Sequence, residues 1–161
     1  MQNFEPDKAL AFLEAGLKQI GLPCPNEVLN YATQKLDGVV GWLTLFGAKC
    51  RDHNKCDKEI VDQVIREGGK LARDEALKLV KLSNRYGIVL TSLAKMGAAS
   101  WTQIKATLEA YEHRSLPSPT VTDLLNKLVR KGFILKKDDR YTVSDPLLRY
   151  GVLEDPLPTA K

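Results

Sequence analysis

Three side chains in one polar stretch of the sequence could bind a metal ion. The segment CRDHNKC contains Cys50, His53 and Cys56, and Cys24 or His113 could supply a fourth ligand. Thiolates and imidazoles suit zinc, but this spacing is not that of the recognised paired zinc motifs. A disulfide between Cys50 and Cys56 is an alternative, because intracellular proteins of thermophiles contain such bonds. Reduced thiols with no bound metal are the favoured expectation.

No group of side chains predicts a catalytic centre. Ser100, Ser115 and Ser118 lie where helix caps and turns are expected, which are positions that serine favours. His113, near Glu109 and Glu112, has the position of a helix-end residue and not of a base directed at a serine. We therefore expect no enzymatic activity from this chain.

The segment 118–132 has the side chains of a DNA-reading helix. Its apolar residues repeat at helical spacing, so the opposite arc should face solvent. Arg and Asn can pair with guanine and adenine edges, and Lys and Thr can contact phosphates. The candidate DNA-contacting residues of this helix and of the hairpin that follows are Thr120, Asn126, Lys127, Arg130, Lys131, Lys136, Lys137 and Arg140. Double-stranded DNA is the partner that this set predicts.

Charge supports this prediction only weakly. Residues 1–83 have twelve Lys and Arg against twelve Asp and Glu, whereas residues 84–161 have twelve against eight. The net charge of +4 thus belongs to the second half. However, a charged outer face is usual for any surface helix, and Asp123, Asp138 and Asp139 would repel phosphate.

Apolar spacing predicts helices through the first half of the chain, within 6–21, 26–38 and 58–83. In the third of these, Gly68-Gly69 should kink or split the helix. No apolar run approaches the length of a membrane span, and the first ten residues lack the pattern of a signal peptide. We expect a cytoplasmic protein without a membrane partner.

The second half predicts three helices followed by a β-hairpin. The helices lie at 84–97, at 100–112, where Ser100 and Gln103 form a capping-box pattern, and at 118–132, where Ser118 should be the N-cap. Trp101, Ile104, Leu108 and Tyr111 should form the inner stripe of the middle helix, and Phe133, Leu135, Tyr141 and Val143 the inward side of the hairpin. Three helices and a hairpin are the order of a winged helix-turn-helix domain.

The expected fold class is therefore mainly α, with a helical lid-like bundle followed by a winged helix-turn-helix domain with a small β-hairpin. The predicted domains are 1–83, a helical lid-like subdomain, and 84–153, a winged-helix domain, with 154–161 as a flexible tail.

Two stretches resemble archaeal P-loop ATPases of the AAA+/STAND type. KLDGVVGWLTLFG, residues 35–47, is similar to the lid motif Gly-x-Pro-Gly-Trp-Leu of that family. The segments NRYGIVLTSLAKMGAASWTQIKATLE and LLNKLVRKGFILKKDDRYTVSDPLLRYGVL resemble its terminal winged helix, including a Tyr-x-x-x-Asp-Pro-x-x-Arg pattern. The chain has no Gly-x-x-x-x-Gly-Lys-Ser/Thr loop, so the resemblance implies a C-terminal lid and winged-helix fragment of a longer ATPase.

The resemblance also implies a nucleotide contact in the parent protein. The lid proline that packs near the base corresponds to Val40, which follows Gly38 and lacks the fixed φ of proline. The alternative is structural, with Gly38 as a helix C-cap and Trp42 in the core. No cofactor is expected in this chain, while ATP and Mg²⁺ are expected for the parent core.

The function expected from all these features is DNA contact by the winged helix, coupled through the lid to nucleotide state in the parent. Two alternatives remain. The winged helix could be a protein-interaction or autoregulatory module that packs on its own ATPase core or another subunit, or the chain could be a free-standing transcription regulator.

Overall fold

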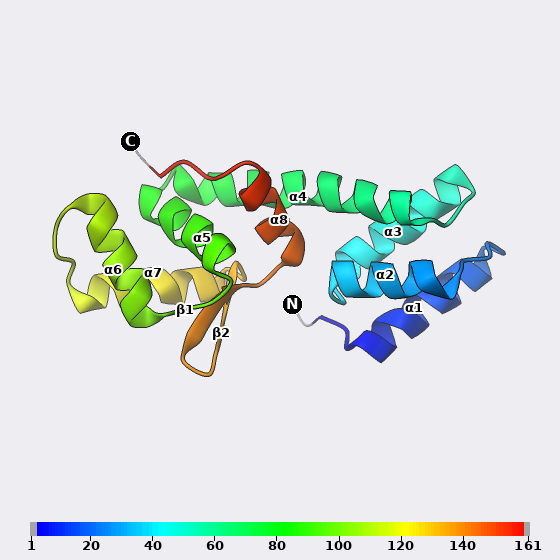
Figure 1. Ribbon diagram of the computed structural model, residues 1–161, viewed down its shortest axis with the longest axis horizontal. Helices are drawn as coiled ribbons and strands as arrows, with labels where there is room; N and C mark the ends of the chain where they lie inside the picture. Colours follow the sequence, from blue (N-terminus) through cyan, green and yellow to red (C-terminus); the bar gives the residue numbers. More distant parts are fainter. Residues whose placement is uncertain (1–2, 160–161) are drawn as a thin grey trace. The chain divides into compact units, whose positions relative to one another are not determined.

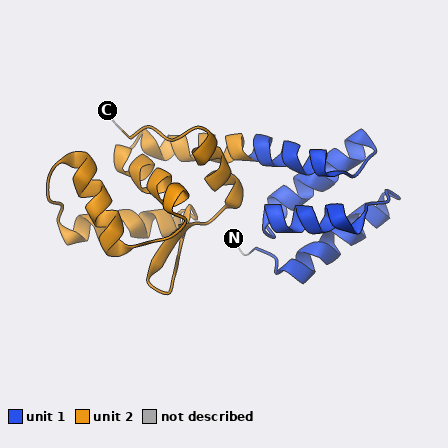
Figure 2. Ribbon diagram, viewed as in Figure 1, with its two compact units in different colours: residues 1–68 blue, residues 69–161 orange. Residues whose placement is uncertain are grey.

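The computed structural model describes residues 3–159, which fold as two compact units (Figure 2). Unit 1 comprises residues 1–68 and unit 2 comprises residues 69–161. The division falls inside one helix, earlier than the change of composition at 83/84 from which the domain boundary was predicted.

Unit 1 is helical (Figure 1). It contains α1 (Pro6–Gln19), α2 (Asn26–Leu36), α3 (Val40–His53) and the first part of α4 (Lys58–Val80). The apolar faces of these helices form its core, which includes Leu13, Leu17, Leu29, Leu36, Leu43, Phe46, Ile60 and Val64. Helix α2 begins at Asn26 with Pro25 as N-cap, and Ile20, at the end of α1, is exposed.

The turn between α2 and α3 requires left-handed backbone at two successive residues. Asp37 has φ 48° and Gly38 has φ 68°. A Cβ atom at Gly38 would collide with the backbone carbonyl of Phe4, whose amide donates to the Gly38 carbonyl over 2.8 Å. Glycine is therefore required here both by φ and by the close approach of another segment.

Unit 2 has the element order of a winged helix. After the end of α4 come α5 (Asn84–Met96), β1 (Ala99–Ser100), α6 (Trp101–Glu112), α7 (Ser118–Arg130), β2 (Ile134–Lys137), β3 (Arg140–Val143) and α8 (Pro146–Glu154). The strands form one antiparallel sheet in the order β1-β3-β2. One apolar cluster fills the interior, with members from every helix of the unit. Neither β1 nor α8 was predicted from the sequence.

The hairpin register corrects one prediction. Ile134 pairs with Val143 and is buried, whereas Leu135 pairs with Thr142 and is 54% exposed. The prediction placed Leu135 on the inward side, which is wrong, because β2 begins one residue later than the alternation suggested. Tyr111, also predicted to face inward, is 48% exposed near the end of α6.

Helix starts follow prediction at α6 and differ at α7. The Ser100 side chain accepts from the Gln103 amide over 3.2 Å and the Gln103 side chain accepts from the Ser100 amide over 2.9 Å, which is the predicted capping box. Ser118 was predicted to cap α7, but Pro117 occupies the N-cap and no side chain caps the helix.

Gly68 and Gly69 do not split α4, which runs unbroken from Lys58 to Val80. Instead they are buried, and Gly69 lies against α8. A Cβ atom at Gly151 would collide with the Gly69 carbonyl, and one at Gly69 would lie 2.9 Å from a ring carbon of Tyr150. These glycines allow close helix packing, which explains their presence within a helix.

The segment after Glu154 is bound to the core of unit 2, within the residues described. Leu157 is 2% exposed and belongs to the apolar cluster. The Arg73 guanidinium donates to the carbonyls of Asp155 and Pro156 and pairs with the Asp155 carboxylate. Residues 155–158 therefore pack on unit 2, whereas residues 160–161 lie outside the described residues, and the flexibility of 154–161 stays a prediction.

Candidate nucleic-acid interface

Helix α7 separates a buried apolar stripe from an exposed polar arc. Val121, Leu124, Leu125 and Leu128 are buried in the core of unit 2. On the opposite side Asn126, Lys127 and Arg130 are exposed, together with Asp123. These four residues and Val129 line a shallow depression on the helix surface. The geometry gives α7 the side chains of a recognition helix on its accessible side.

The start of α6 fixes the position of α7 by a side-chain contact. The Trp101 indole Nε1 donates to the Thr122 hydroxyl over 3.2 Å. Lys105, one turn further along α6, has its ammonium 5.8 Å from the centre of the Trp101 ring. This contact links the two helices of the helix-turn-helix outside the apolar core.

The wing is a tight hairpin whose turn residues are both aspartates. Asp138 and Asp139 have φ of 51° and 60°, the left-handed backbone that a two-residue hairpin turn requires. Lys137 pairs with Arg140 at the end of the ladder. The Arg140 guanidinium donates to the Ala98 carbonyl over 3.3 Å, and the Lys136 ammonium lies 5.7 Å from the centre of the Tyr141 ring.

The six cations of α7 and the wing lie close together in the sequence, and none of them is in an ion pair among the described residues. Among the described residues, salt bridges engage nine Lys and Arg side chains, and none of those nine lies between 115 and 159. The segment from α7 through the wing has six cations against three carboxylates. Its cationic residues are Lys127, Arg130, Lys131, Lys136, Lys137 and Arg140, all exposed. Positive potential here is therefore available to an anionic partner.

The structure places the predicted DNA-contacting residues on one continuous polypeptide segment, and each of them is exposed except Thr120, which is half-buried. Val129 was not predicted, although it is 37% exposed in the depression on α7. The sequence contained one sign of this, because Val129 lies beside the leucine stripe, and a residue at that position can contact either the core or a ligand.

The lid positions lie in the corner between α2 and α3. Val40 is the first residue of α3 and is half-buried, and Gly38 is buried against Phe4. The C-cap of α2 is Asp37, one residue before the predicted Gly38. Trp42 is half-buried and is not a fully buried core residue. Whether this corner contacts a nucleotide in a longer protein stays a prediction.

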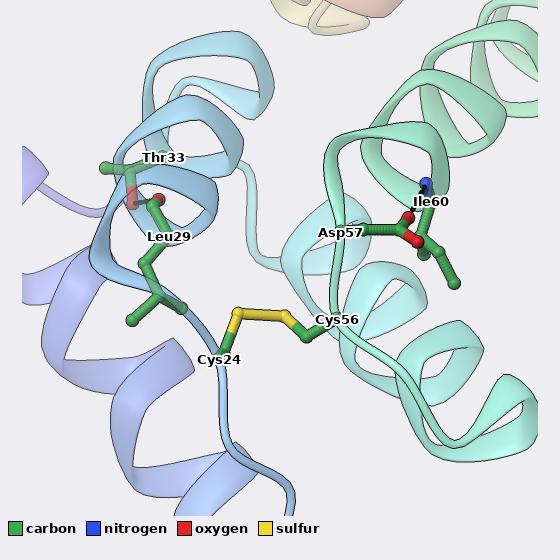
Figure 3. The surroundings of a disulfide bond; sticks show 6 residues. All are labelled: Cys24, Leu29, Thr33, Cys56, Asp57 and Ile60. Atoms are coloured by element: carbon green, nitrogen blue, oxygen red, sulfur yellow. Dashed lines mark hydrogen bonds between the residues drawn. A yellow bond between two sulfur atoms is a disulfide. The ribbon is translucent and has the colours of Figure 1, made fainter.

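The cysteines pair differently from every sequence-based alternative. Cys24 forms a disulfide with Cys56, with 5.3 Å between their Cα atoms (Figure 3). Cys50 is a buried free thiol, and burial raises its pKa to about 12. The prediction of reduced thiols holds for Cys50 and is wrong for Cys24 and Cys56, and the alternative Cys50–Cys56 disulfide is wrong. The bond also engages two of the proposed zinc ligands. Within residues 3–159, no three His, Cys, Asp or Glu side chains converge as a metal-binding cluster.

The disulfide joins two loops of unit 1. Cys24 precedes α2 and Cys56 precedes α4, so the bond ties the starts of both helices together (Figure 3). Beside it, the Asp57 carboxylate accepts from the Ile60 amide over 3.0 Å, which caps α4, and this hydrogen bond lowers the Asp57 pKa. Among residues 3–159, no helix combines the length and apolar character that a membrane crossing needs.

Comparison with known proteins agrees with this architecture. Residues 81–144 match the family model of the MCM protein C-terminal winged helix-turn-helix domain. Among solved structures, the Walker-type ATPase of Pyrococcus abyssi matches 94% of this chain at 26% sequence identity with a TM-score of 0.80. The match covers 42% of that protein, so this chain spans less than half of its length. No curated protein matches the chain. Unit 2 therefore contains a winged helix-turn-helix domain, and the chain resembles the C-terminal, winged-helix-bearing region of an archaeal P-loop ATPase.

Proposed function

We propose that unit 2 contacts double-stranded DNA through α7 and the wing. Winged-helix domains are non-catalytic modules that bind DNA or other proteins. The observation that carries this proposal is the group of six exposed cations on α7 and the wing, none of them in an ion pair among the described residues. Cations that stabilise their own fold are usually paired, whereas cations left unpaired together suit phosphates.

The roles within this surface differ by side-chain type. Asn126 and Arg130 lie on the exposed arc of α7 and can pair with base edges in the major groove. Thr120, Lys127 and Lys131 are suited to phosphates beside that groove. From the wing, Lys136, Lys137 and Arg140 would reach neighbouring phosphates, while Asp138 and Asp139 limit how closely the tip can approach. With few phosphate contacts, binding should be weak and strongly salt-dependent.

The wider context proposed is an archaeal AAA+-type ATPase in which this chain is the lid and winged-helix region. Support comes from the likeness to the Walker-type ATPase of Pyrococcus abyssi over 94% of this chain. In such a parent, Gly38 and Val40 would lie near the nucleotide, and ATP and Mg²⁺ would bind the preceding core. The reading frame upstream of Met1 tests this proposal, because a phosphate-binding loop encoded there supports it and the lack of one removes it.

The DNA proposal is tested by fluorescence anisotropy with a labelled duplex at two salt concentrations. The double variant K127E/R130E should lose at least about tenfold in affinity, and the slope of log affinity against log salt should fall by about one, for the phosphate contact of Lys127. The matched control is K70E/K78E, which makes the same charge change on α4, outside α7 and the wing.

The control variant should retain most of the binding. An equal loss of DNA affinity in both variants would mean that the overall charge of the protein, and not the position of the cations, determines binding. Unchanged binding in K127E/R130E would mean that α7 does not contact DNA. Circular dichroism of each variant checks that the helices are intact.

A further inference from the structure

A second surface of unit 2, away from α7 and the wing in the sequence, forms an open cleft of about 900 Å³. Four segments line it, namely the end of α4 with the turn that follows, the start of α5, the end of α6 with the turn after it, and Thr159 near the C-terminus. All of its lining residues belong to unit 2, and none belongs to α7 or the wing. The volume is within the range of ligand and peptide sites.

An ion pair between two residues that line the cleft joins α5 to α6. Arg85 donates to both carboxylate oxygens of Glu112, over 2.9 and 3.0 Å, and Arg114 approaches the same carboxylate at 3.2 Å. The hydrogen bonds from Arg85, together with its charge, lower the pKa of Glu112 and keep it ionised. A bidentate pair of this kind fixes the side chains as well as the helices.

Two large apolar side chains lie exposed in this cleft. Leu82, in the turn between α4 and α5, is 74% exposed, which is the largest value among the exposed large hydrophobic residues described. Tyr111, which was expected to face inward, is 48% exposed and also lines the cleft. The buried residues Val80 and Ile88 contribute further apolar lining. A single exposed leucine is common on protein surfaces, but here Leu82 and Tyr111 line the same concave site, where an apolar side chain of a partner would cover them.

The charge of the cleft defines the partner more closely. Three cations and one carboxylate line it, and Arg85 is already engaged by Glu112. Lys81 has no ion pair among the described residues, and Arg114 shares a carboxylate that Arg85 already neutralises. The positive charge that remains therefore surrounds an apolar centre, which suits acidic side chains flanking an apolar one.

We propose that this cleft is a docking site for an acidic protein segment that inserts an aliphatic or aromatic side chain between Leu82 and Tyr111 and pairs its carboxylates with Lys81 and Arg114. Concave shape and exposed apolar side chains favour a peptide over duplex DNA, whose phosphates would gain nothing from covering Leu82. The site is separate from the proposed DNA surface, so either can fail without the other.

The experiment selects peptides with the whole chain as target. A phage library of randomised 12-residue peptides is panned against the wild-type protein and counter-selected against the double variant L82S/R114E. Enriched sequences should contain an aliphatic or aromatic residue flanked by Asp or Glu. Labelled copies of these peptides are then titrated by fluorescence anisotropy against the wild type and against the single variants.

L82S should weaken binding by about tenfold or more, as expected for loss of a buried leucine contact. K81E should weaken it further at low salt, and the effect should shrink as salt rises. The matched controls are L153S and K70E, which alter an exposed leucine and an exposed lysine outside the cleft. Both should bind like the wild type.

Three outcomes would overturn the proposal. One is a lack of enrichment over the counter-selected variant, and another is enrichment of basic or uncharged sequences. The third is displacement of the peptide by duplex DNA together with loss of DNA binding in R114E, which would assign the cleft to nucleic acid. Because Leu82, Lys81 and Arg114 are exposed, their substitution should leave the fold intact, and circular dichroism confirms this for each variant.

Discussion

Unit 1 carries eight Lys and Arg against ten Asp and Glu, whereas unit 2 carries sixteen against ten. In unit 1 half of the cations are in ion pairs, as in Lys49 with Glu67 and Lys58 with Glu27, and Lys8 and Lys35 lie over aromatic rings. In unit 2 the six cations of α7 and the wing have no ion pair among the described residues. Most cations of unit 1 thus interact with side chains of the same unit, whereas the cations of α7 and the wing in unit 2 could pair with an anionic partner.

The two units also differ in what stabilises them. Unit 1 has a disulfide between the segments that precede α2 and α4. Unit 2 has no cysteine, and a single apolar cluster with residues from five helices and the sheet is its main support. A unit that presents unpaired cations to a partner has to be stabilised by its interior, because its surface charges repel one another.

The largest expected effect is loss of the disulfide. The C24S/C56S variant should lose about 3–4 kcal/mol of stability in unit 1, because the bond joins residues separated by 32 positions and restricts the unfolded chain. Native-state hydrogen exchange measures this region by region. Amides of α2 and α3 should exchange faster, while those of α5 and α7 stay protected. Equal acceleration in both units would end the comparison, because it would mean that the bond stabilises the entire chain.

A methyl group would collide with backbone at Gly38 in unit 1 and at Gly87 and Gly151 in unit 2. We expect G38A in unit 1 and G151A in unit 2 to cost about 2–3 kcal/mol each in urea unfolding. G38A combines a collision with Phe4 and a positive φ, so its cost should be the larger. G41A is the control, since nothing lies near its Cβ position, and a neutral or slightly stabilising effect is expected there. If G151A did not lower the stability in urea unfolding, α4 and α8 would be able to move apart at little cost in free energy.

The core of unit 2 contains one buried hydroxyl, that of Thr91, without a hydrogen-bond partner among the described residues. T91V should therefore raise the stability of unit 2 by about 1 kcal/mol. In unit 1 the Thr33 hydroxyl donates to the Leu29 carbonyl over 2.8 Å, so T33V should give no comparable gain. Thermal unfolding of both variants checks this, and an unchanged or lower midpoint for T91V would indicate that its hydroxyl is solvated.

The smallest effect concerns two glutamates with lowered pKa values. Glu27 in unit 1 is paired with Lys58, and Glu112 in unit 2 with Arg85 and Arg114. A folded pKa below the unfolded value gives stability that is present above the unfolded pKa and is lost as pH falls through the folded one. E112Q should cost about 0.5 kcal/mol or less at neutral pH, and the cost should vanish in acid. E27Q should be nearly silent, because that pair is on the surface. Urea unfolding at neutral and acidic pH measures both costs, and a larger loss of stability in E27Q than in E112Q would contradict this prediction.

Several parts of the fold followed directly from residue types and spacing. The stripe Val121, Leu124, Leu125 and Leu128 predicted α7 and its orientation, because burying four apolar side chains leaves only one possible outward arc. The capping box at Ser100 and the helix end at Gly97 are equally local, since each involves residues within one turn. The winged-helix order could be predicted for that reason, and so could the exposure of Asn126, Lys127 and Arg130.

Only the tertiary structure decided the features that depend on contacts between distant segments. Cys24 pairs with Cys56 because helix packing brings the loop before α2 against the loop before α4, and no sequence spacing encodes that approach. Gly69 is tolerated within a helix because α8 packs on it, and Leu157 is buried because the segment after α8 joins the apolar cluster of unit 2. Hydrophobic periodicity reports which side of an element is apolar. It cannot report which partner covers that side, because the partner is chosen by packing among all elements at once.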